Sequence, residues 1–346
     1  MSAIKKCCLP YKTGRDYHKI AEGAQKLPQS IWKGEDHEDE QSTGGRRSFH
    51  LRENAQLYLI MLPVLLHIFI FSYIPMYGII IAFQDYFPGK PFFSLTDTNW
   101  VGFKHFIEFF NGPYFGRLMR NTFSLSFYFL VFGFWVPILF AVLLNELKNG
   151  IFKKYVQTAS YLPHFISNVV VAGMVLSFIN TDGIINTIVK MFGGTSVAIN
   201  TEAGYFPAIY TITSIWKSFG WSSILYLAAM SSVDPHLYEA AKMDGANRFK
   251  QILHISLPSI RPTILFLLIF AIGSLFSANS EFILLIYNPM VYETADVIGT
   301  YLYRDGLLGG QFSLGTAVGL FISVINFALL YFANTLSRKY SDYALW

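Results

Sequence analysis

Residues 234–262 read DPHLYEAAKMDGANRFKQILHISLPSIRP and join two long apolar segments of the chain. Asp234 suits a helix N-cap and Pro235 a first turn, because an aspartate oxygen accepts from free backbone N–H groups and proline needs no donor there. Gly245 suits the end of that helix, since glycine adopts the left-handed conformation at little cost. A second helix is expected to follow until Pro258 removes a backbone donor. The stretch therefore predicts two short helices joined by a glycine hinge.

Physical chemistry alone leaves two interpretations of this helix pair open. The pair fits an amphipathic element that lies on lipid headgroups, with its Lys and Arg side chains toward water. It fits a structured loop that binds another protein equally well. The apolar segments on either side show which class of protein carries the loop.

The composition predicts an integral membrane protein. Of 346 residues, 53% are hydrophobic and 14% are charged, against about 25% charged in soluble proteins. A membrane helix needs roughly 20 apolar residues, and four segments of 25 to 32 residues contain no Asp, Glu, Lys or Arg: 54–84, 121–145, 155–181 and 306–337. A fifth, 262–280, holds 19 residues, and a sixth, 203–233, is interrupted only by Lys217. We therefore expect an all-α membrane protein with six transmembrane helices.

Lys and Arg indicate the orientation, because they remain on the cytoplasmic side of a membrane. With both termini inside, the cytoplasmic segments next to the spans carry twelve of them: Arg46, Arg47, Arg52, Lys148, Lys153, Lys154, Lys242, Arg248, Lys250, Arg261, Arg338 and Lys339. The opposite side carries six: Lys90, Lys104, Arg117, Arg120, Lys190 and Arg304. Residues 1–53 lack a signal peptide's apolar stretch and are predicted to be a cytoplasmic tail. The loop at 234–262 is therefore expected in the cytoplasm, within a membrane domain that spans 54–346.

The composition and the residue spacing disfavour several classes of protein. A net charge of +4, with basic residues sorted by membrane side, disfavours a nucleic-acid binder. The two cysteines are adjacent, at Cys7 and Cys8, so no disulfide framework is expected. His254 has no Cys or His at metal-ligand spacing, and no metal site is predicted. A secondary transporter driven by an ion gradient stays open as an alternative, although only Glu281 lies near a span and no repeat is evident.

The loop also carries a motif at fixed offsets: Glu239, Ala240, Ala241, Asp244, Gly245, Ala246, Ile255, Leu257, Pro258 and Pro262. In this order the residues resemble the EAA loop of bacterial ABC importer permeases. Other stretches are similar to the carbohydrate and polysaccharide branch of that family, which is related to the maltose permease: YIPMYG at 73–78, WVGF at 100–103, LPHFIS at 162–167 and FSLGTA at 312–317. Residues before 46 fall outside the resemblance.

The resemblance implies the pore subunit of an ATP-driven, binding-protein-dependent importer of an oligosaccharide or polysaccharide in the bacterial cytoplasmic membrane. Implied partners are a second related permease, two ATPase subunits and an extracytoplasmic solute-binding protein that docks near residues 100–120. The chain lacks a GxxxxGK[ST] motif, so it is not expected to be an enzyme or to bind a cofactor, and ATP and Mg would bind the partner ATPase. A permease for a non-carbohydrate solute is a second alternative, because importers of all substrates share the loop.

The same resemblance implies roles in coupling for the loop residues. Glu239 is expected to pair with a basic residue of the ATPase, Ala240 and Ala241 to allow close approach, and Gly245 to permit the bend. Asp244, Leu257 and Pro258 complete this coupling set. Each has a simpler alternative, since Glu239 also fits a solvated surface charge and alanine is a good helix former.

Candidate residues of the substrate pathway are polar or aromatic side chains within spans, where polar groups usually face a watery path. Ser214, Lys217 and Trp221 fall on one helical face, and Trp216 and Phe219 lie nearby. The alternative for Lys217 is snorkelling toward outer headgroups, and the lysine alone does not specify an acidic sugar.

A second group of candidates lies near the end of the fifth span and on the sixth: Phe276, Asn279, Ser280, Glu281 and Asn326. The first four occupy the region that lines the sugar site in the similar maltose permease. Gly273, Ser277 and Glu281 also share a face if the helix is continuous, and Glu281 fits the end of a span equally well. A role as an interhelical hydrogen-bonding residue is favoured for Asn326.

His164 and Asn168 are two polar residues of the predicted third span. A structural role is favoured for both, because Pro163 suggests a helix entry there.

Overall fold

The computed structural model describes residues 55–89, 99–340 and 344–345, without the side chains of 55–57 and 340. It consists of two units, 1–66 and 67–346. In the first unit the description is limited to the beginning of helix α2 (Ala55–Ile68), so the predicted tail at 1–53 lies outside the described residues.

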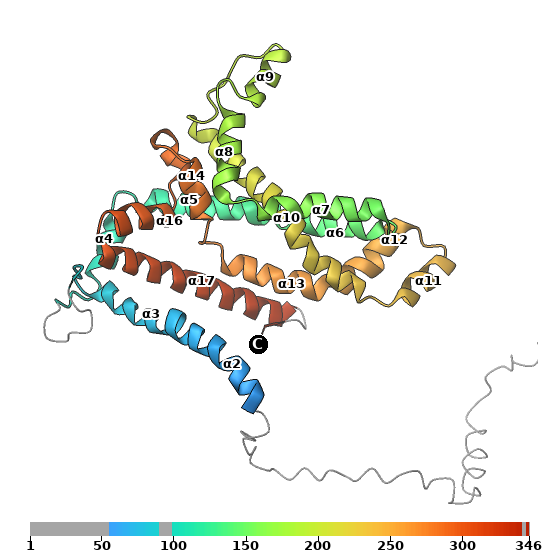
Figure 1. Ribbon diagram of the computed structural model, residues 1–346, viewed down its shortest axis with the longest axis horizontal. Coiled ribbons are helices and arrows are strands. Elements are labelled where there is room, and N and C mark those ends of the chain that lie inside the picture. The colour runs from blue at the N-terminus through green and yellow to red at the C-terminus, as the bar shows by residue number, and fades with distance from the viewer. Residues whose placement is uncertain (1–54, 90–98, 341–343, 346) are drawn as a thin grey trace, which may run out of the picture. The chain divides into compact units, whose positions relative to one another are not determined.

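The described residues form helices and connecting segments, with one isolated bridge between Gln84 and Trp100 (Figure 1). The α-helices after α2 are α3 (Ile74–Met76), α4 (Lys104–Asn111), α5 (Phe115–Tyr128), α6 (Trp135–Glu146), α7 (Ile151–Phe165), α8 (Asn168–Ile179), α9 (Ile184–Met191), α10 (Phe206–Ser231), α11 (Pro235–Met243), α12 (Arg248–Gln251), α13 (Leu257–Gly273), α14 (Ser280–Ile286), α15 (Tyr292–Ala295), α16 (Ile298–Tyr301) and α17 (Phe312–Tyr340). Wider π-helical turns are η2 (Phe69–Tyr73), η4 (Phe129–Gly133), η6 (Ile252–Ser256) and η8 (Leu302–Leu308), and 3₁₀ turns are η3 (Tyr77–Phe83), η5 (Ala203–Tyr205) and η7 (Pro289–Val291). The predicted all-α class is confirmed.

Five described helical stretches are long and apolar enough to cross a membrane: Tyr58–Phe83, Phe115–Glu146, Asn168–Met191, Arg248–Gly273 and Phe312–Lys339. Helix α10, the predicted fourth span, has 26 residues, or roughly 39 Å at 1.5 Å per residue. It does not reach the same apolarity because it carries Lys217 and many Ser, Thr, Tyr and Trp residues. A total of six spans remains a prediction.

The predicted third span, 155–181, is not one continuous helix. Helix α7 ends at Phe165, where Ile166 is extended with ψ of 133°, and Ser167 caps α8 by accepting from the Val170 N–H. Pro163 therefore lies in the last turn of a helix, and the predicted helix entry at this proline was wrong. A run of apolar residues predicts a segment that can lie in the membrane, but it does not predict where the helix within that segment breaks.

The second loop helix does not stop at Pro258, contrary to the sequence prediction. Helical backbone continues from α12 through η6 into α13, and Pro258 occupies the first turn of α13. Proline removes the N–H that an α-helix needs, and local π adjustment is a known way to accommodate it in membrane helices. The loop and the fifth predicted span thus form one helical stretch.

That stretch ends early, at Gly273. Residues 274–279 are not helical, and Asn279 caps the new helix α14 by accepting from the Phe282 N–H at 3.2 Å. The expectation that Gly273, Ser277 and Glu281 share one helical face was therefore wrong.

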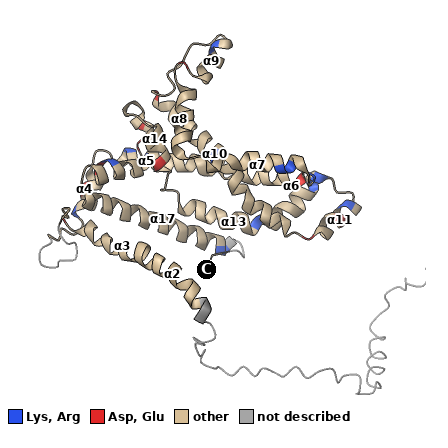
Figure 2. Ribbon diagram, in the orientation of Figure 1, with Lys and Arg blue, Asp and Glu red and all other residues tan. Residues whose placement is uncertain are grey.

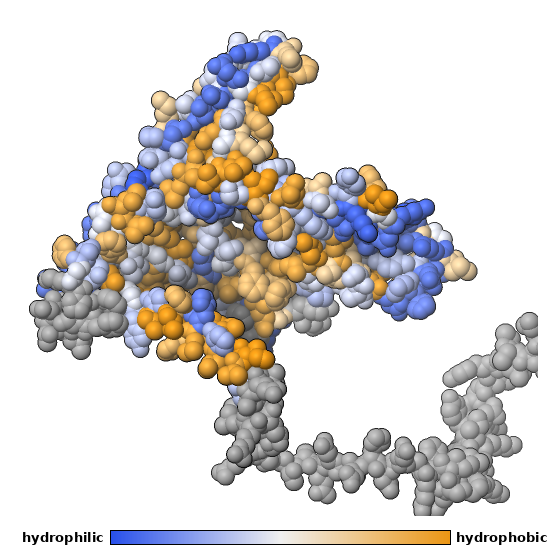
Figure 3. All heavy atoms as spheres, viewed as in Figure 1, coloured by the Kyte–Doolittle hydropathy of each residue, from blue (hydrophilic) through white to orange (hydrophobic). Residues whose placement is uncertain are grey.

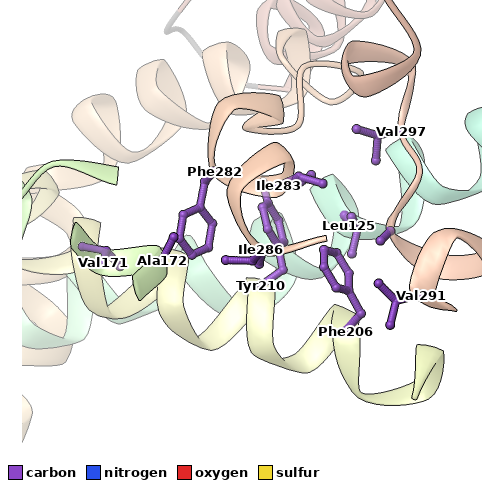
Figure 4. Close-up of a cluster of buried hydrophobic side chains, with 11 residues drawn as sticks. Leu125, Val171, Ala172, Phe206, Tyr210, Phe282, Ile283, Ile286, Val291 and Val297 are labelled. Atoms are coloured by element: carbon purple, nitrogen blue, oxygen red, sulfur yellow. The ribbon is translucent and has the colours of Figure 1, made fainter. Parts of the chain in front are cut away.

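Helix α10 is the central packing element of the second unit. It packs against α6, α7 and α13, and a Cβ at Gly220 would lie only 2.0 Å from the Ser160 carbonyl oxygen of α7. Such small-residue contacts let membrane helices approach closely. One buried cluster joins α10 to α5, α8, α14 and the segment after α14 (Figure 4): Leu125, Val171, Ala172, Phe206, Tyr210, Phe282, Ile283, Ile286, Val291, Ala295 and Val297.

Candidate functional site

A cavity of about 450 Å³ lies next to this cluster, between η4, α10, the α7–α8 break and the non-helical segment before α14. Its lining combines aromatic side chains with hydroxyl, amide and ammonium groups. The lining residues are Ser126, Phe129, Leu130, Phe134, His164, Asn168, Tyr210, Thr213, Ser214, Lys217, Ser218, Ala271, Ser274, Ser277, Ala278, Asn279 and Phe282. A concave, mainly apolar pocket with a few polar groups is typical of ligand sites.

A chain of three polar side chains runs from the cavity lining, where Lys217 and Asn168 lie, to Glu281 outside the lining. The Lys217 ammonium donates a hydrogen bond to Asn168 Oδ1. The Asn168 amide nitrogen donates in turn to Glu281 Oε2 at 2.7 Å. We call these three residues the polar relay. Helices α10, α8 and α14 each contribute one member, so the relay forms only when all three are packed together.

Two breaks in the helices determine where Asn168 and Glu281 lie. Asn168 is the first residue of α8 because the helix breaks at Ile166 and Ser167. Glu281 lies in the first turn of α14, whose N-cap Asn279 donates its backbone N–H to the Tyr210 hydroxyl at 3.0 Å. In a membrane, non-helical backbone is tolerated where it is buried in protein or lines a cavity. The non-helical segment before α14 contributes Ser274, Ser277, Ala278 and Asn279 to the cavity lining, and His164 and Asn168 line it from either side of the break at Ile166 and Ser167.

Three predicted pathway residues line the cavity directly: Ser214, Lys217 and Asn279. Glu281 joins them through Asn168. Sequence reasoning missed this position of Asn168, which it assigned a structural role. The available signal was an amide side chain close to Pro163, where a helix entry was predicted. The partners of Asn168, Lys217 and Glu281, lie 49 and 113 residues away in sequence.

The aromatic candidates on α10 lie outside this cavity. Trp221 stacks on His164 with ring centroids 4.7 Å apart, and Phe219 meets Phe140 of α6 edge-on at 5.0 Å. Trp216 is 40% exposed on the chain. These rings pack α10 against its neighbours or face outward from it.

The remaining candidates hold the segment before α14 in place. Asn326 of α17 accepts from the Phe276 N–H at 3.1 Å and donates to Ser277 Oγ at 2.9 Å. Asn326 therefore bonds α17 to the non-helical segment, whereas the sequence favoured a hydrogen bond between two helices. Ser280 lies against α16, because a Cβ at Gly299 would come within 2.5 Å of the Ser280 Cβ.

The loop at 234–262 has the predicted helix and hinge. Asp234 caps α11 by accepting from the His236 N–H at 2.9 Å, and Gly245 has φ of +75°. Arg248 anchors the loop to the end of α6 through an ion pair with Glu146, with Nη1 and Oε2 2.9 Å apart. Ala240 and Ala241 lie within α11, Asp244 follows it as its C-cap, and Leu257 and Pro258 begin α13.

The outer surface of this loop mixes charged and apolar side chains. Glu239 is exposed and lies 3.3 Å from His236. Leu237, Met243 and Phe249 are 51%, 88% and 71% exposed. Figure 2 shows basic residues gathered where α6, α11 and α12 lie, and Figure 3 shows this end as largely hydrophilic. The loop therefore offers an exposed surface fixed to the membrane helices.

A buried charge cluster holds the segment between α14 and α17. Asp296 is fully buried, and its carboxylate accepts from Arg117 at 2.9 Å, from Arg304 at 3.1 Å and from Thr300 at 2.9 Å. Burial disfavours the charged guanidinium of Arg304, but hydrogen bonding to Asp296 and the Asp296 charge outweigh this and raise its pKa. No sequence pattern indicates this cluster, because the ion-paired residues Arg117 and Asp296 lie 179 residues apart in the chain. Among the described residues no group of three or more His, Cys, Asp or Glu side chains is placed to hold a metal ion.

Comparison with known proteins identifies a family of transport proteins that this chain resembles. The model of the family described as "Binding-protein-dependent transport system inner membrane component" matches residues 130–342. The polygalacturonan/rhamnogalacturonan transport system permease protein YteP of Bacillus subtilis is 43% identical over 297 residues, which cover 86% of this chain and 92% of that protein.

Solved structures of similar sequence share the fold. One is a bacterial ABC transporter involved in the import of the acidic polysaccharide alginate, with a TM-score of 0.76 and 41% identity over 84% of this chain and 97% of that one. Another is a bacterial alginate ABC transporter in complex with an alginate pentasaccharide-bound periplasmic protein, with a TM-score of 0.77 and 40% identity over 85% of this chain and 98% of that one.

Proposed function

The chain belongs to the binding-protein-dependent transport system inner membrane component family, and on this premise we propose that it forms half of the pore of an ATP-driven importer for a polysaccharide or large oligosaccharide. It is a membrane-embedded transport subunit and not a catalytic enzyme. The observation that carries the substrate class is its 43% identity, over 86% of the chain, to a polygalacturonan/rhamnogalacturonan permease.

The cavity is the part of the chain that we assign to the substrate pathway. Hydroxyl and amide groups of Ser214, Ser218 and Asn279 can hydrogen-bond sugar hydroxyls, and Phe129 and Phe134 offer apolar ring faces. Of the residues predicted from sequence, we retain Ser214, Lys217, Asn279 and Glu281 as pathway residues. Phe219, Trp221, Phe276, Ser280 and Asn326 pack or hydrogen-bond the elements around it, and the exposed Trp216 is not retained.

The loop at 234–262 is proposed to couple the pore to two partner ATPase subunits. Glu239 is exposed for a basic partner residue, and Leu237, Met243 and Phe249 supply apolar contact area. ATP and Mg would bind those partners. In such an importer the pore alternates between an inward-open and an outward-open state. ATP binding shifts this equilibrium only if its affinity differs between the two states, and the loop would transmit the shift from the ATPase to the pore.

The proposed assembly also contains a second permease and an extracytoplasmic solute-binding protein, with both termini of this chain in the cytoplasm. Support for a binding protein comes from the alginate transporter of similar fold, which was solved with a substrate-loaded periplasmic protein. The predicted docking region near residues 100–120 includes Trp100 and Phe103, which are 52% and 66% exposed.

Reconstitution of the assembly in proteoliposomes tests this function. We expect uptake of polygalacturonan or alginate oligosaccharides that requires ATP, the ATPase subunits and the loaded binding protein. An assembly whose ATPase lacks its P-loop lysine is the control and is expected to be inactive. Uptake driven by an ion gradient without the ATPase would contradict the proposal and favour a secondary transporter.

A further inference from the structure

We propose that the polar relay is a carboxylate-binding site for an acidic sugar unit. Lys217 binds the carboxylate, Asn168 positions the lysine, and Glu281 is the counter-charge when the site is empty. This inference rests on the proposed function, because it names the substrate class of the same cavity.

The first argument concerns charge. Lys217 is the single Asp, Glu, Lys or Arg within the 26 residues of α10. A charged side chain within a membrane segment is costly, and it usually pairs with another charge or lines a pathway. Lys217 instead contacts the neutral amide of Asn168. The carboxylate of Glu281 is one residue further away, on the other side of that amide.

The second argument concerns hydrogen-bonding capacity. An ammonium group has three donors, and the described contact with Asn168 uses one of them. The amide oxygen cannot remove the positive charge, because it accepts a hydrogen bond without carrying a full negative charge. A ligand carboxylate that enters the cavity can therefore bind Lys217 while Asn168 keeps its place.

The third argument concerns position. Lys217 lines the cavity, and so do Ser214 and Ser218 on the same helix. Charge-assisted hydrogen bonds are roughly twice as strong as neutral ones, so one ammonium among hydroxyl groups would discriminate an acidic sugar from its neutral counterpart. Glu281 is exposed, and its negative charge would oppose an acidic ligand unless Lys217 outweighs it. The two charges are therefore expected to affect binding with opposite sign.

Equilibrium dialysis on the purified assembly without its binding protein tests the site. The probes are radiolabelled tri-galacturonic acid and its neutral trimethyl ester. We expect Lys217→Met to raise the dissociation constant of the acid about ten-fold or more and to leave that of the ester within about two-fold. Lys190→Met is the matched control, since Lys190 is exposed at the end of α9, and it is expected to change neither constant.

Two further variants separate binding from folding. Glu281→Gln removes the counter-charge and is expected to tighten binding of the acid. Asn168→Asp places a carboxylate directly against Lys217 and is expected to weaken binding of the acid as Lys217→Met does. A relay that only stabilises the fold would give the same sign for Glu281→Gln and Lys217→Met, with equal effects on acid and ester.

Two results would overturn the proposal. One is equal weakening of acid and ester by Lys217→Met, and the other is a wild-type assembly that binds the ester as tightly as the acid or binds neither. The proposed function is tested separately, by ATP-dependent uptake with the loaded binding protein. Uptake that persists without carboxylate discrimination in the cavity would therefore reject the site alone.

Discussion

Gly245 joins the two helices of the 234–262 loop with φ of +75°, a conformation that L side chains rarely adopt. A valine there adds strain of ~1–2 kcal/mol, and 1.4 kcal/mol corresponds to about a ten-fold change in an equilibrium. We therefore predict that Gly245→Val inserts normally into the membrane but lowers ATP-dependent uptake about ten-fold. Uptake by proteoliposomes, normalised to the amount of assembled protein, measures this.

Gly193 provides the control for this change. It also has positive φ, at +80°, and no neighbour near its added Cβ, but it follows α9 outside the loop. Gly193→Val carries the same local strain and is expected to keep normal uptake. Equal losses in both variants would mean that strain, and not the position of the hinge, explains the result.

Asp296 holds several side chains together through its carboxylate. Its buried carboxylate is shared by Arg117 and Arg304, and removing one partner of a buried ion pair typically costs about 3–5 kcal/mol. The arginines are 31% and 29% exposed, so solvent screening reduces the expected loss for Asp296→Asn to roughly 2–3 kcal/mol. Denaturant unfolding of the purified assembly measures it. Asp305→Asn is the control, because Asp305 is 33% exposed and pairs with Arg304 at the surface, and a loss as large as that of Asp296→Asn would contradict the assignment.

The residues of the site show what a sequence can and cannot indicate. Lys217 was predicted because a charge in an apolar segment is rare enough to notice. Asn168 was not, because an amide is common and its significance comes from Lys217 and Glu281, which reach it only in the folded chain. Trp221 was assigned to the pathway because it shares a helical face with Ser214 and Lys217, but its own ring stacks on His164 and does not line the cavity.

At the scale of elements, the contact between α7 and α10 depends on the absence of a side chain at Gly220. A Cβ there would lie 2.0 Å from the Ser160 carbonyl oxygen, so the backbones would have to separate. We predict that Gly220→Ala destabilises the fold by about 1–3 kcal/mol, the usual cost of overpacking. Gly173→Ala in α8 is the control, because no atom lies within 4 Å of its added Cβ. Thermal unfolding in detergent compares the two, and a Gly220→Ala variant as stable as Gly173→Ala would show that the helices can separate without cost.

Helix positions were predictable from the sequence, but helix breaks were not. The apolar runs at 54–84, 121–145 and 306–337 coincide with helical stretches long and apolar enough to cross a membrane, because hydrophobic length is a property of composition. The breaks after Phe165 and Gly273 were not foreseen. Both depend on caps, Ser167 and Asn279, which lie inside apolar runs where a break is not expected.

At the scale of the whole molecule, one helical stretch links the proposed coupling loop to the cavity. Helical backbone runs from Arg248 to Gly273, and its last turn contributes Ala271 to the cavity lining. The Arg248–Glu146 ion pair ties its beginning to α6. A tilt imposed at the loop would therefore move the cavity wall as part of the same rod, and this is how an ATPase bound at one end could change access at the other.

This mechanism requires the loop and the end of α9 to lie on opposite sides of the membrane. Met243 and Met191 are 88% and 79% exposed, so single cysteines at these positions would be accessible to reagents. In a background with Cys7→Ser and Cys8→Ser, we predict that a membrane-impermeant maleimide labels Met243→Cys only in inside-out vesicles and Met191→Cys only in right-side-out vesicles. Binding of the ATPase subunits is expected to protect Met243→Cys and to leave Met191→Cys reactive. Labelling of Met243→Cys from outside would overturn the orientation and the coupling role together, because an extracytoplasmic loop cannot reach an ATPase that uses cytoplasmic ATP.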